Sequence, residues 1–244
     1  MGSGLVVPDL SAGQHDGVMT GMDAETDWVA GQDGYALNIS GATHEVRATG
    51  VPTLTGNWTF VITCRLPLTA SDFSMIFQRN PTAAPNWPGP FDFRADARSN
   101  PAPVTCLYGS VAANKLYSVA TDAANHLTLG EWATFAVTYD DAVGATLYRD
   151  GLFVAFNRFH ASQDDGEPVR LGMRADGVTG DIEIAQASIC DRALSADEVS
   201  WLYAEPHAPI WTPNPVWYFD TGAVAFRPRP FTQHRHGPRL VTGG

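Results

Sequence analysis

The amino-acid sequence predicts an all-β fold, a β-sandwich with one short helix and an extended C-terminal arm. Apolar and polar residues alternate over 58–66 and over 132–139, which is the period of a strand with one buried face. Asp150-Gly151 separates two further alternating segments, and it favours a type I′ hairpin because both central residues of that turn adopt positive φ. Residues 132–156 are therefore predicted to form strand, turn, strand, tight turn and strand.

Length and composition agree with a folded domain. The chain has 244 residues, of which 44% are hydrophobic and 17% charged, so a sizeable core can form in one large all-β domain or two small ones. The formal net charge of −11 favours solubility and disfavours binding to phosphate backbones, so no nucleic-acid partner is expected.

The N-terminal residues lack a basic region followed by an apolar run, and no stretch of the sequence approaches the ~18 apolar residues of a membrane span. We therefore expect synthesis in the cytosol and no membrane insertion. Cys64, Cys106 and Cys190 are widely spaced and odd in number, which argues against a disulfide framework or a zinc site. Cys64 lies in an alternating segment and is interpreted as a small buried hydrophobe.

Further strands are expected between turn-rich segments along the chain. The predicted strands span residues 17–20, 34–39, 44–48, 58–66, 75–78, 91–94, 104–108, 132–139, 145–149, 152–156, 169–173 and 181–190. A helix should follow them, because Ser195 and Glu198 form a capping-box pattern and Val199, Leu202 and Tyr203 form an apolar stripe. Pro206 should stop this helix.

Residues 80–90 contain four prolines, which exclude ladder pairing and predict a loop. Trp87 lies in the middle of it. An exposed loop tryptophan is a candidate glycan-binding platform, since an aromatic face can stack on a sugar ring. The alternative is that Trp87 folds back and anchors its own loop.

Several segments, in their order, resemble the laminin-G-like or concanavalin A-like jelly-roll family. They are DLSAGQHDGVMTGM and GYALNISGATHEVRA near the start, GEW, TYD and LYRDGLFV in the centre, and GDIEIAQASICDRALS before the helix. The resemblance covers residues 9 to about 205 and implies a jelly-roll β-sandwich over residues 1–205. Family members commonly begin with a further strand. Only residues 1–7 remain for it here, so it is either abbreviated or its edge is covered by a neighbouring chain.

The resemblance also suggests possible roles for the acidic residues. Glycosidases of this fold use a Glu-Xaa-Asp-Xaa-Glu strand, and here Asp181 and Glu183 follow Thr179, which stands in place of the first Glu. A structural role or a place at a calcium rim is therefore favoured over catalysis. Many such domains hold one calcium ion, and Asp9, Asp16 or Asp181 could contribute ligands. We expect no enzymatic activity, since other catalytic motifs are absent from the sequence.

Composition changes at Pro206. Residues 206–244 hold seven of the 17 prolines, four arginines and a single acid, Asp220. We interpret this segment as an extended arm that buries its aromatic residues against its own body or against another subunit. The candidate docking residues are Trp211, Trp217, Tyr218, Phe219, Arg227 and Arg229. His234 and His236 lie on one side of an extended arm, where a threefold axis would gather six imidazoles around a transition metal, or they belong to an exposed polar tail.

Two functions fit these observations. The sequence resembles stand-alone laminin-G-like proteins of tailed bacteriophages and prophages, which implies a non-enzymatic virion protein: a head decoration, a fibre or a tail-associated subunit. Such a protein would be assembled in the host cytoplasm, contact other virion subunits or itself, and present a surface to cell-surface glycans. The alternative is a free-standing lectin or glycoside hydrolase of the concanavalin A-like fold.

Overall fold

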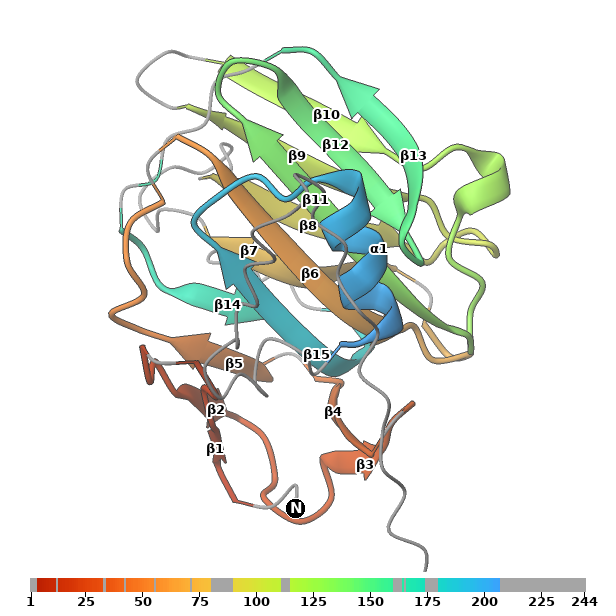
Figure 1. Cartoon of the computed structure of the whole chain (residues 1–244). Coiled ribbons are helices and arrows are strands. Elements are labelled where there is room, and N and C mark those ends of the chain that lie inside the picture. The colour runs from red at the N-terminus through yellow and green to blue at the C-terminus, as the bar shows by residue number, and fades with distance from the viewer. Residues whose placement is uncertain are drawn as a thin grey trace, which may run out of the picture. The chain divides into compact units, whose positions relative to one another are not determined.

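A computed structural model describes residues 4–11, 13–32, 34–41, 43–54, 56–70, 72–79, 90–110, 115–159, 164, 166–173 and 180–206. These residues form two antiparallel sheets, stacked as a sandwich, with one α-helix on the outside of one sheet (Figure 1). The predicted fold class, an all-β jelly-roll sandwich with a short C-terminal helix, is confirmed. The predicted C-terminal arm, residues 206–244, lies outside the described residues except for Pro206.

One sheet has eight strands in the order β1-β2-β5-β14-β7-β8-β9-β10. Their bounds are Val6–Val7, Gly17–Thr20, Glu45–Ala48, Val169–Leu171, Phe73–Arg79, Phe91–Asp96, Val104–Ser110 and Lys115–Ala120. The other sheet has seven strands in the order β13-β12-β11-β6-β15-β4-β3. Their bounds are Leu152–Asn157, Gly144–Arg149, Trp132–Asp140, Trp58–Arg65, Ile182–Cys190, Tyr35–Ile39 and Trp28–Ala30. A short 3₁₀ helix, η1, spans Ala123–Asn125.

The hydrophobic core lies between the sheets. The alternating segment predicted from the sequence supplies its central strand, β6, whose inward side chains Trp58, Phe60, Ile62 and Cys64 are buried. Phe60 contacts Phe77, Phe91 and Phe93 of the facing sheet, with ring centroids 5.0–5.4 Å apart. Aromatic contacts of this kind join the two layers and add to the stabilisation from burial. The interpretation of Cys64 as a buried hydrophobe is confirmed.

The hairpin between β12 and β13 has the predicted turn. Asp150 has φ of 50° and Gly151 of 78°, as a type I′ turn requires. Leu147 points into the core, whereas its neighbour Tyr148 lies in a small cluster on the outer face of the seven-stranded sheet. The strand period of two accounts for this placement on opposite faces of the sheet.

Three strands differ from expectation. The first strand is abbreviated, since β1 contains only Val6 and Val7 and pairs with β2. Two strands were missed, β3 and β10, and both lie at an edge of their sheet. Edge strands pair on one side only, so β3 carries just one apolar-rich triplet and β10 mixes apolar and polar residues without a clear alternation.

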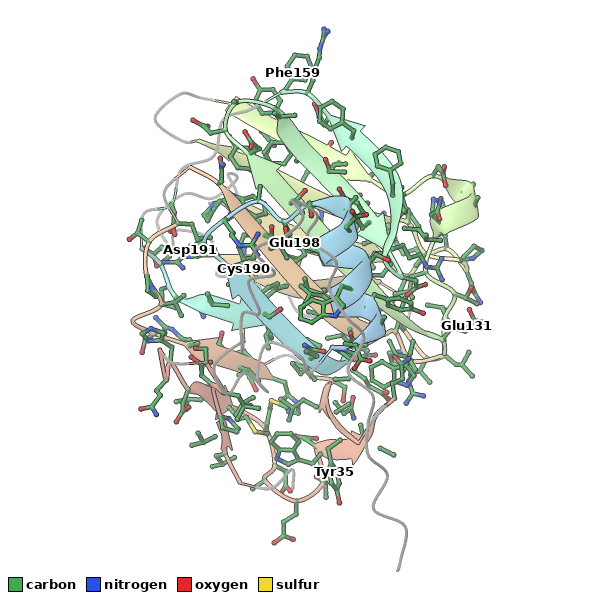
Figure 2. The ribbon with its side chains drawn as sticks, viewed as in Figure 1. Tyr35, Glu131, Phe159, Cys190, Asp191 and Glu198 are labelled. Carbon is green, nitrogen blue, oxygen red and sulfur yellow. The ribbon has the colours of Figure 1, made fainter. Side chains whose placement is uncertain are left out.

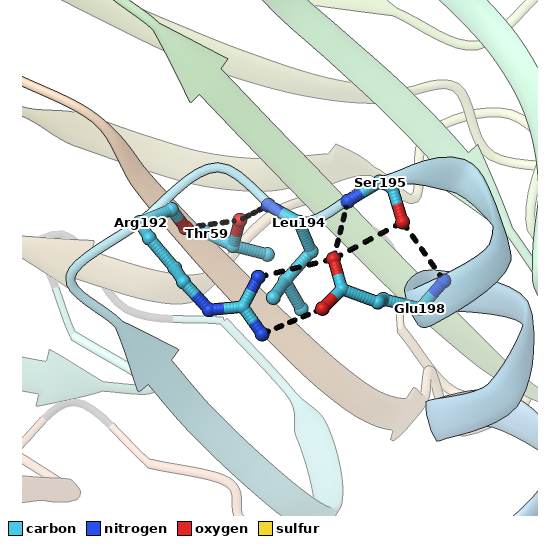
Figure 3. Close-up of polar contacts among 5 residues, drawn as sticks. All are labelled: Thr59, Arg192, Leu194, Ser195 and Glu198. Carbon is cyan, nitrogen blue, oxygen red and sulfur yellow. Dashed lines mark hydrogen bonds and ion pairs between the residues drawn. The ribbon is translucent and has the colours of Figure 1, made fainter. Parts of the chain in front are cut away.

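Helix α1 (Ala196–Ala204) is fixed to the seven-stranded sheet through Thr59 of β6. The Thr59 hydroxyl donates to the Arg192 carbonyl (2.8 Å) and accepts from the Leu194 N–H (2.9 Å) (Figure 3). The predicted capping box is present: the Ser195 hydroxyl accepts from the Glu198 N–H, and the Glu198 carboxylate accepts from the Ser195 N–H. Arg192 also donates two hydrogen bonds to Glu198 and lowers the pKa of that carboxyl to about 2.

One fully buried ion pair joins two loops to the eight-stranded sheet. Arg79, at the end of β7, places Nε 2.9 Å from Oδ1 of Asp164, and both side chains are 0% exposed. The guanidinium also donates to the carbonyls of Val51 and Pro52, while Asp164 accepts from the Leu54 N–H. Burial lowers the pKa of Arg79, and the charge of Asp164 opposes that shift.

Candidate functional site

The outer face of the seven-stranded sheet has two parts. Helix α1 lies across one part, where Val61, Ala136, Tyr148, Leu194 and Val199 form an apolar cluster (Figure 1). The other part lies further along the same strands, and its outward-facing side chains are polar or aromatic. This second part carries the candidate site.

Strand register places four side chains in one line across that part of the sheet. Asn38 of β4 pairs with Glu183 of β15, Glu183 pairs with Arg65 of β6, and Arg65 pairs with Trp132 of β11. Directly paired residues in antiparallel strands point to the same face. Their sequence neighbours Leu37, Ile184, Cys64 and Ala133 are buried in the core, so the four point outward. We call Asn38, Glu183, Arg65 and Trp132 the polar row.

Three members of the polar row are in contact. Arg65 Nε donates to Glu183 Oε2 at 2.6 Å, and a second guanidinium nitrogen contacts the same oxygen. The guanidinium carbon of Arg65 lies 4.9 Å from the ring centroid of Trp132, a cation–π distance. The side chains of Arg65 and Glu183 remain 29% and 13% exposed. Arg65 is therefore held between an anion and an indole while part of its surface faces solvent.

A second line of polar side chains lies beside this row, toward the helix. Gln186 pairs with Thr63, which pairs with Thr134, and the two threonine hydroxyls are 2.9 Å apart. A bulge between Ile184 and Gln186 lets Glu183 and Gln186 share the outer face despite their odd spacing. Gln186 Nε2 donates to the Pro206 carbonyl at 2.8 Å, so the chain leaves α1 next to the polar row.

This arrangement suits recognition of a polar ring with an apolar face. An indole offers a flat apolar surface, while amide, hydroxyl and guanidinium groups offer donors and acceptors within the same small area. The groups are carried by central strands rather than loops, so their spacing is fixed by the sheet ladder. Glu131, the residue before Trp132 in the sequence, is exposed (Figure 2).

The same geometry bears on catalysis. Asp181 and Glu183 were considered from the sequence as a catalytic pair. The Glu183 carboxylate is occupied by Arg65, and the Asp181 carbonyl accepts a hydrogen bond from Ser74 of the opposite sheet.

Burial raises the pKa of the Cys64 thiol to about 12 and also raises those of Cys106 and Cys190. These thiols are therefore protonated and poor nucleophiles at neutral pH.

Asp9 and Asp16, two of the predicted calcium ligands, stabilise the loop between β1 and β2. The Asp9 carboxylate accepts from the N–H groups of Ser11 and His15, and the Asp9 N–H donates to Asp16. Burial raises the pKa of Asp9, but these N–H donors outweigh it and the pKa is lowered overall. In the described ranges, no group of three or more His, Cys, Asp or Glu could hold a metal ion, so Asp181 does not join them. Calcium binding stays a prediction.

The other predicted site residues lie outside the described residues. They are Trp87, the histidines His234 and His236, and the docking residues Trp211, Trp217, Tyr218, Phe219, Arg227 and Arg229. Of the helices that the structure describes, none has the length and apolarity needed to span a membrane.

A family model for the concanavalin A-like lectin/glucanases superfamily matches residues 61–200, more than half of the chain. The chain belongs to this superfamily. The matched range contains Arg65, Trp132 and Glu183 of the polar row, while Asn38 precedes it. The resemblance stated from the sequence is thereby confirmed at the level of the family. No curated protein matches the chain.

Solved structures of the same fold include three toxin domains. The receptor-binding domain of botulinum neurotoxin C/D mosaic serotype has 11% identity and a TM-score of 0.63, covering 81% of this chain and 48% of that chain. The binding domain of Paraclostridial Mosquitocidal Protein 1 has 14% identity and a TM-score of 0.63, covering 82% and 50%. The botulinum neurotoxin serotype D ligand-binding domain in complex with N-acetylneuraminic acid has 10% identity and a TM-score of 0.60, covering 84% and 51%.

The chain thus spans about half the length of these neighbours, and at such identities the likeness concerns the fold alone. The polar row was not foreseen from the sequence, although one signal was present. Alternation places Arg65 and Trp132 on the outer faces of their strands. The contact between Arg65 and Glu183 joins two strands whose residues are 118 positions apart in the sequence. Alternation alone does not specify which strands pair.

Proposed function

We propose that this protein is a non-enzymatic, glycan-binding surface domain that uses the outer face of its seven-stranded sheet. Membership of a lectin and glucanase superfamily supports a carbohydrate ligand. Neighbours described as receptor-binding domains, one of them in complex with N-acetylneuraminic acid, support binding rather than cleavage. Thr179 in place of the first Glu of the glycosidase strand supports the absence of a catalytic nucleophile, and Arg65 occupies the carboxylate of Glu183.

The observation that carries the proposal is the polar row. Trp132 provides a face for the apolar side of a pyranose, and Asn38, Arg65 and Glu183 provide hydrogen-bonding groups for its hydroxyls. The cation–π contact between Arg65 and Trp132 holds the indole in one orientation before any ligand binds. Less side-chain entropy is therefore lost on binding.

The test is glycan-array binding of the purified protein, followed by titration of the strongest ligand. Trp132→Ala should weaken binding at least about tenfold while the protein stays folded, because an aromatic anchor contributes a large share of the binding energy. Trp201→Ala is the matched control, since Trp201 is 53% exposed on α1 and lies outside the row. Loss of binding in Trp201→Ala with no change in Trp132→Ala would contradict the proposal, as would hydrolysis of a bound polysaccharide.

The setting proposed for this domain is the surface of a bacteriophage particle, assembled in the host cytoplasm. The support is the sequence resemblance to stand-alone phage proteins and the composition of residues 206–244, whose prolines, arginines and aromatics suit docking. The arm would dock the protein onto another virion subunit or another copy, leaving the outer sheet face to meet cell-surface glycans.

Mass spectrometry of purified particles from the source tests this setting directly. The protein should co-purify with the particles in stoichiometric amounts, and Trp211→Ala with Trp217→Ala should reduce its incorporation while the body stays folded. Particles that lack the protein would contradict the virion role and leave the glycan-binding proposal standing.

A further inference from the structure

The charges of the polar row bear on which class of glycan it accepts. Arg65 is the cation of the row, and its closest polar partner is the Glu183 carboxylate, which takes the Nε hydrogen bond at 2.6 Å and a second guanidinium contact. The pair is partly desolvated, since Glu183 is only 13% exposed, so the two charges offset each other with little screening.

An anionic sugar would meet this pair at a disadvantage. A ligand carboxylate that approached Arg65 would lie beside Glu183, and like charges at that separation repel. The N–H donors of Arg65 that Glu183 leaves free could reach a ligand carboxylate, but Glu183 already offsets the charge of Arg65, so this carboxylate would gain less than at an unpaired arginine. The chain as a whole carries a net charge of −11, which further disfavours the approach of an anion.

Neutral hydroxyls face no such conflict. A guanidinium has five N–H donors, and the two nitrogens that contact Glu183 do not use all of them. A carboxylate oxygen that already accepts from Arg65 can accept from a sugar hydroxyl as well. Arg65 lies over one face of the Trp132 indole, so a pyranose would stack on the opposite face, and such stacking requires no charge.

We propose that Glu183 is a specificity-determining residue that neutralises Arg65 and restricts the polar row to uncharged glycans. This inference rests on the proposed glycan-binding function and deepens it. It also separates this protein from the serotype D neurotoxin domain, whose structure is in complex with the acidic sugar N-acetylneuraminic acid.

The test is a set of matched glycan pairs, in which each neutral oligosaccharide is compared with the same structure carrying a uronic acid or N-acetylneuraminic acid. Wild type should bind the neutral member at least about tenfold more tightly. Glu183→Gln keeps the side-chain shape and frees Arg65, so affinity for the acidic member should rise about tenfold or more, and this gained affinity should fall as salt is added.

Glu131→Gln is the matched control, because it removes one negative charge from the exposed sequence neighbour of Trp132 and leaves the contacts of Arg65 with Glu183 and Trp132 in place. It should leave the preference for neutral ligands unchanged. Preference of the wild type for acidic members, or an equal effect of Glu131→Gln and Glu183→Gln, would overturn the inference while glycan binding stands. Binding to neither member would overturn the proposed function and this inference together.

Circular dichroism and thermal melting of Glu183→Gln establish that the variant is folded. Arg65→Lys, with Glu183 intact, should keep the preference for neutral glycans.

Discussion

Two arginine–carboxylate pairs of this protein have similar chemistry and different surroundings. Arg79 and Asp164 are fully buried, and backbone groups of residues 51–54 form hydrogen bonds with both side chains. Arg65 and Glu183 lie on an outer sheet face, beside an indole, with part of their surface open to solvent. The comparison indicates that the first pair holds loops in place, whereas the second stands on an open face, where we propose that it presents a neutralised charge to a ligand.

The largest effect is expected at the buried pair. Arg79→Leu should reduce the free energy of unfolding by about 3–5 kcal/mol, because it leaves the Asp164 carboxylate buried without its cation. Urea denaturation followed by circular dichroism measures the loss. The double variant Arg79→Leu with Asp164→Leu should recover part of it, since the uncompensated charge is then gone. A loss below about 1 kcal/mol in the single variant would show that the pair is solvated like a surface pair.

The second-largest loss of stability is expected at Thr59, the residue that anchors helix α1 to the sheet. Thr59→Val keeps the side-chain shape and removes the hydroxyl that bonds to Arg192 and Leu194, leaving the buried Leu194 N–H unpaired. We expect a loss of about 1–3 kcal/mol in the free energy of unfolding. Hydrogen exchange locates the effect: amides of α1 should exchange faster, while those of β6 and β11 stay protected. Uniform acceleration across both sheets would contradict an anchoring role.

The Arg65–Glu183 pair on the outer face should matter less for stability than for binding. Glu183→Gln should change the free energy of unfolding by about 1 kcal/mol or less, because the guanidinium of Arg65 keeps access to water. Comparison with Arg79→Leu under the same urea conditions is the measurement. Equal destabilisation by the two variants would show that both pairs are structural and would remove the contrast between them.

The smallest effect concerns Glu198 and pH. Its folded-state pKa, about 2, lies below the usual 4.5, so its contribution is complete above pH 4.5 and is lost as the pH falls toward 2. The Arg192–Glu198 pair is 58% and 41% exposed, which limits the contribution to below about 1 kcal/mol. The difference in stability between wild type and Glu198→Gln should therefore shrink between pH 6 and pH 3, as measured by urea denaturation at each pH.

Much of the fold followed from local sequence pattern. Alternation located β6 and β11, the Asp150-Gly151 pair located the hairpin, and Ser195 with Glu198 located the start of α1. These features depend on residues close in sequence, where propensity and turn chemistry decide. The missed strands β3 and β10 lie at sheet edges, where one neighbour rather than two selects the residues.

The candidate site depended on non-local pairing and was not predicted. Glu183 was considered as a possible acid, but its partner Arg65 lies 118 positions away, and strand alternation indicates only that Arg65 lies on an outer face. A β-bulge after Ile184 shifts the register of β15, and a strict period of two would not have placed Gln186 beside Thr63. Trp132 marked a strand in the sequence, whereas in the fold it forms the aromatic end of the polar row.

The central claim is that Trp132 and its neighbours bind an uncharged glycan, and the indole N–H resonance of Trp132 reports on it most directly. With ¹⁵N-labelled protein, that resonance is assigned by its disappearance in Trp132→Phe and followed during titration with a neutral oligosaccharide selected on the array. It should shift in a saturable manner, and the resonances of buried Trp58 and of Trp201 should stay in place. The acidic counterpart should need at least about tenfold higher concentration for the same shift. A Trp132 resonance that stays unmoved while another indole shifts would contradict the claim.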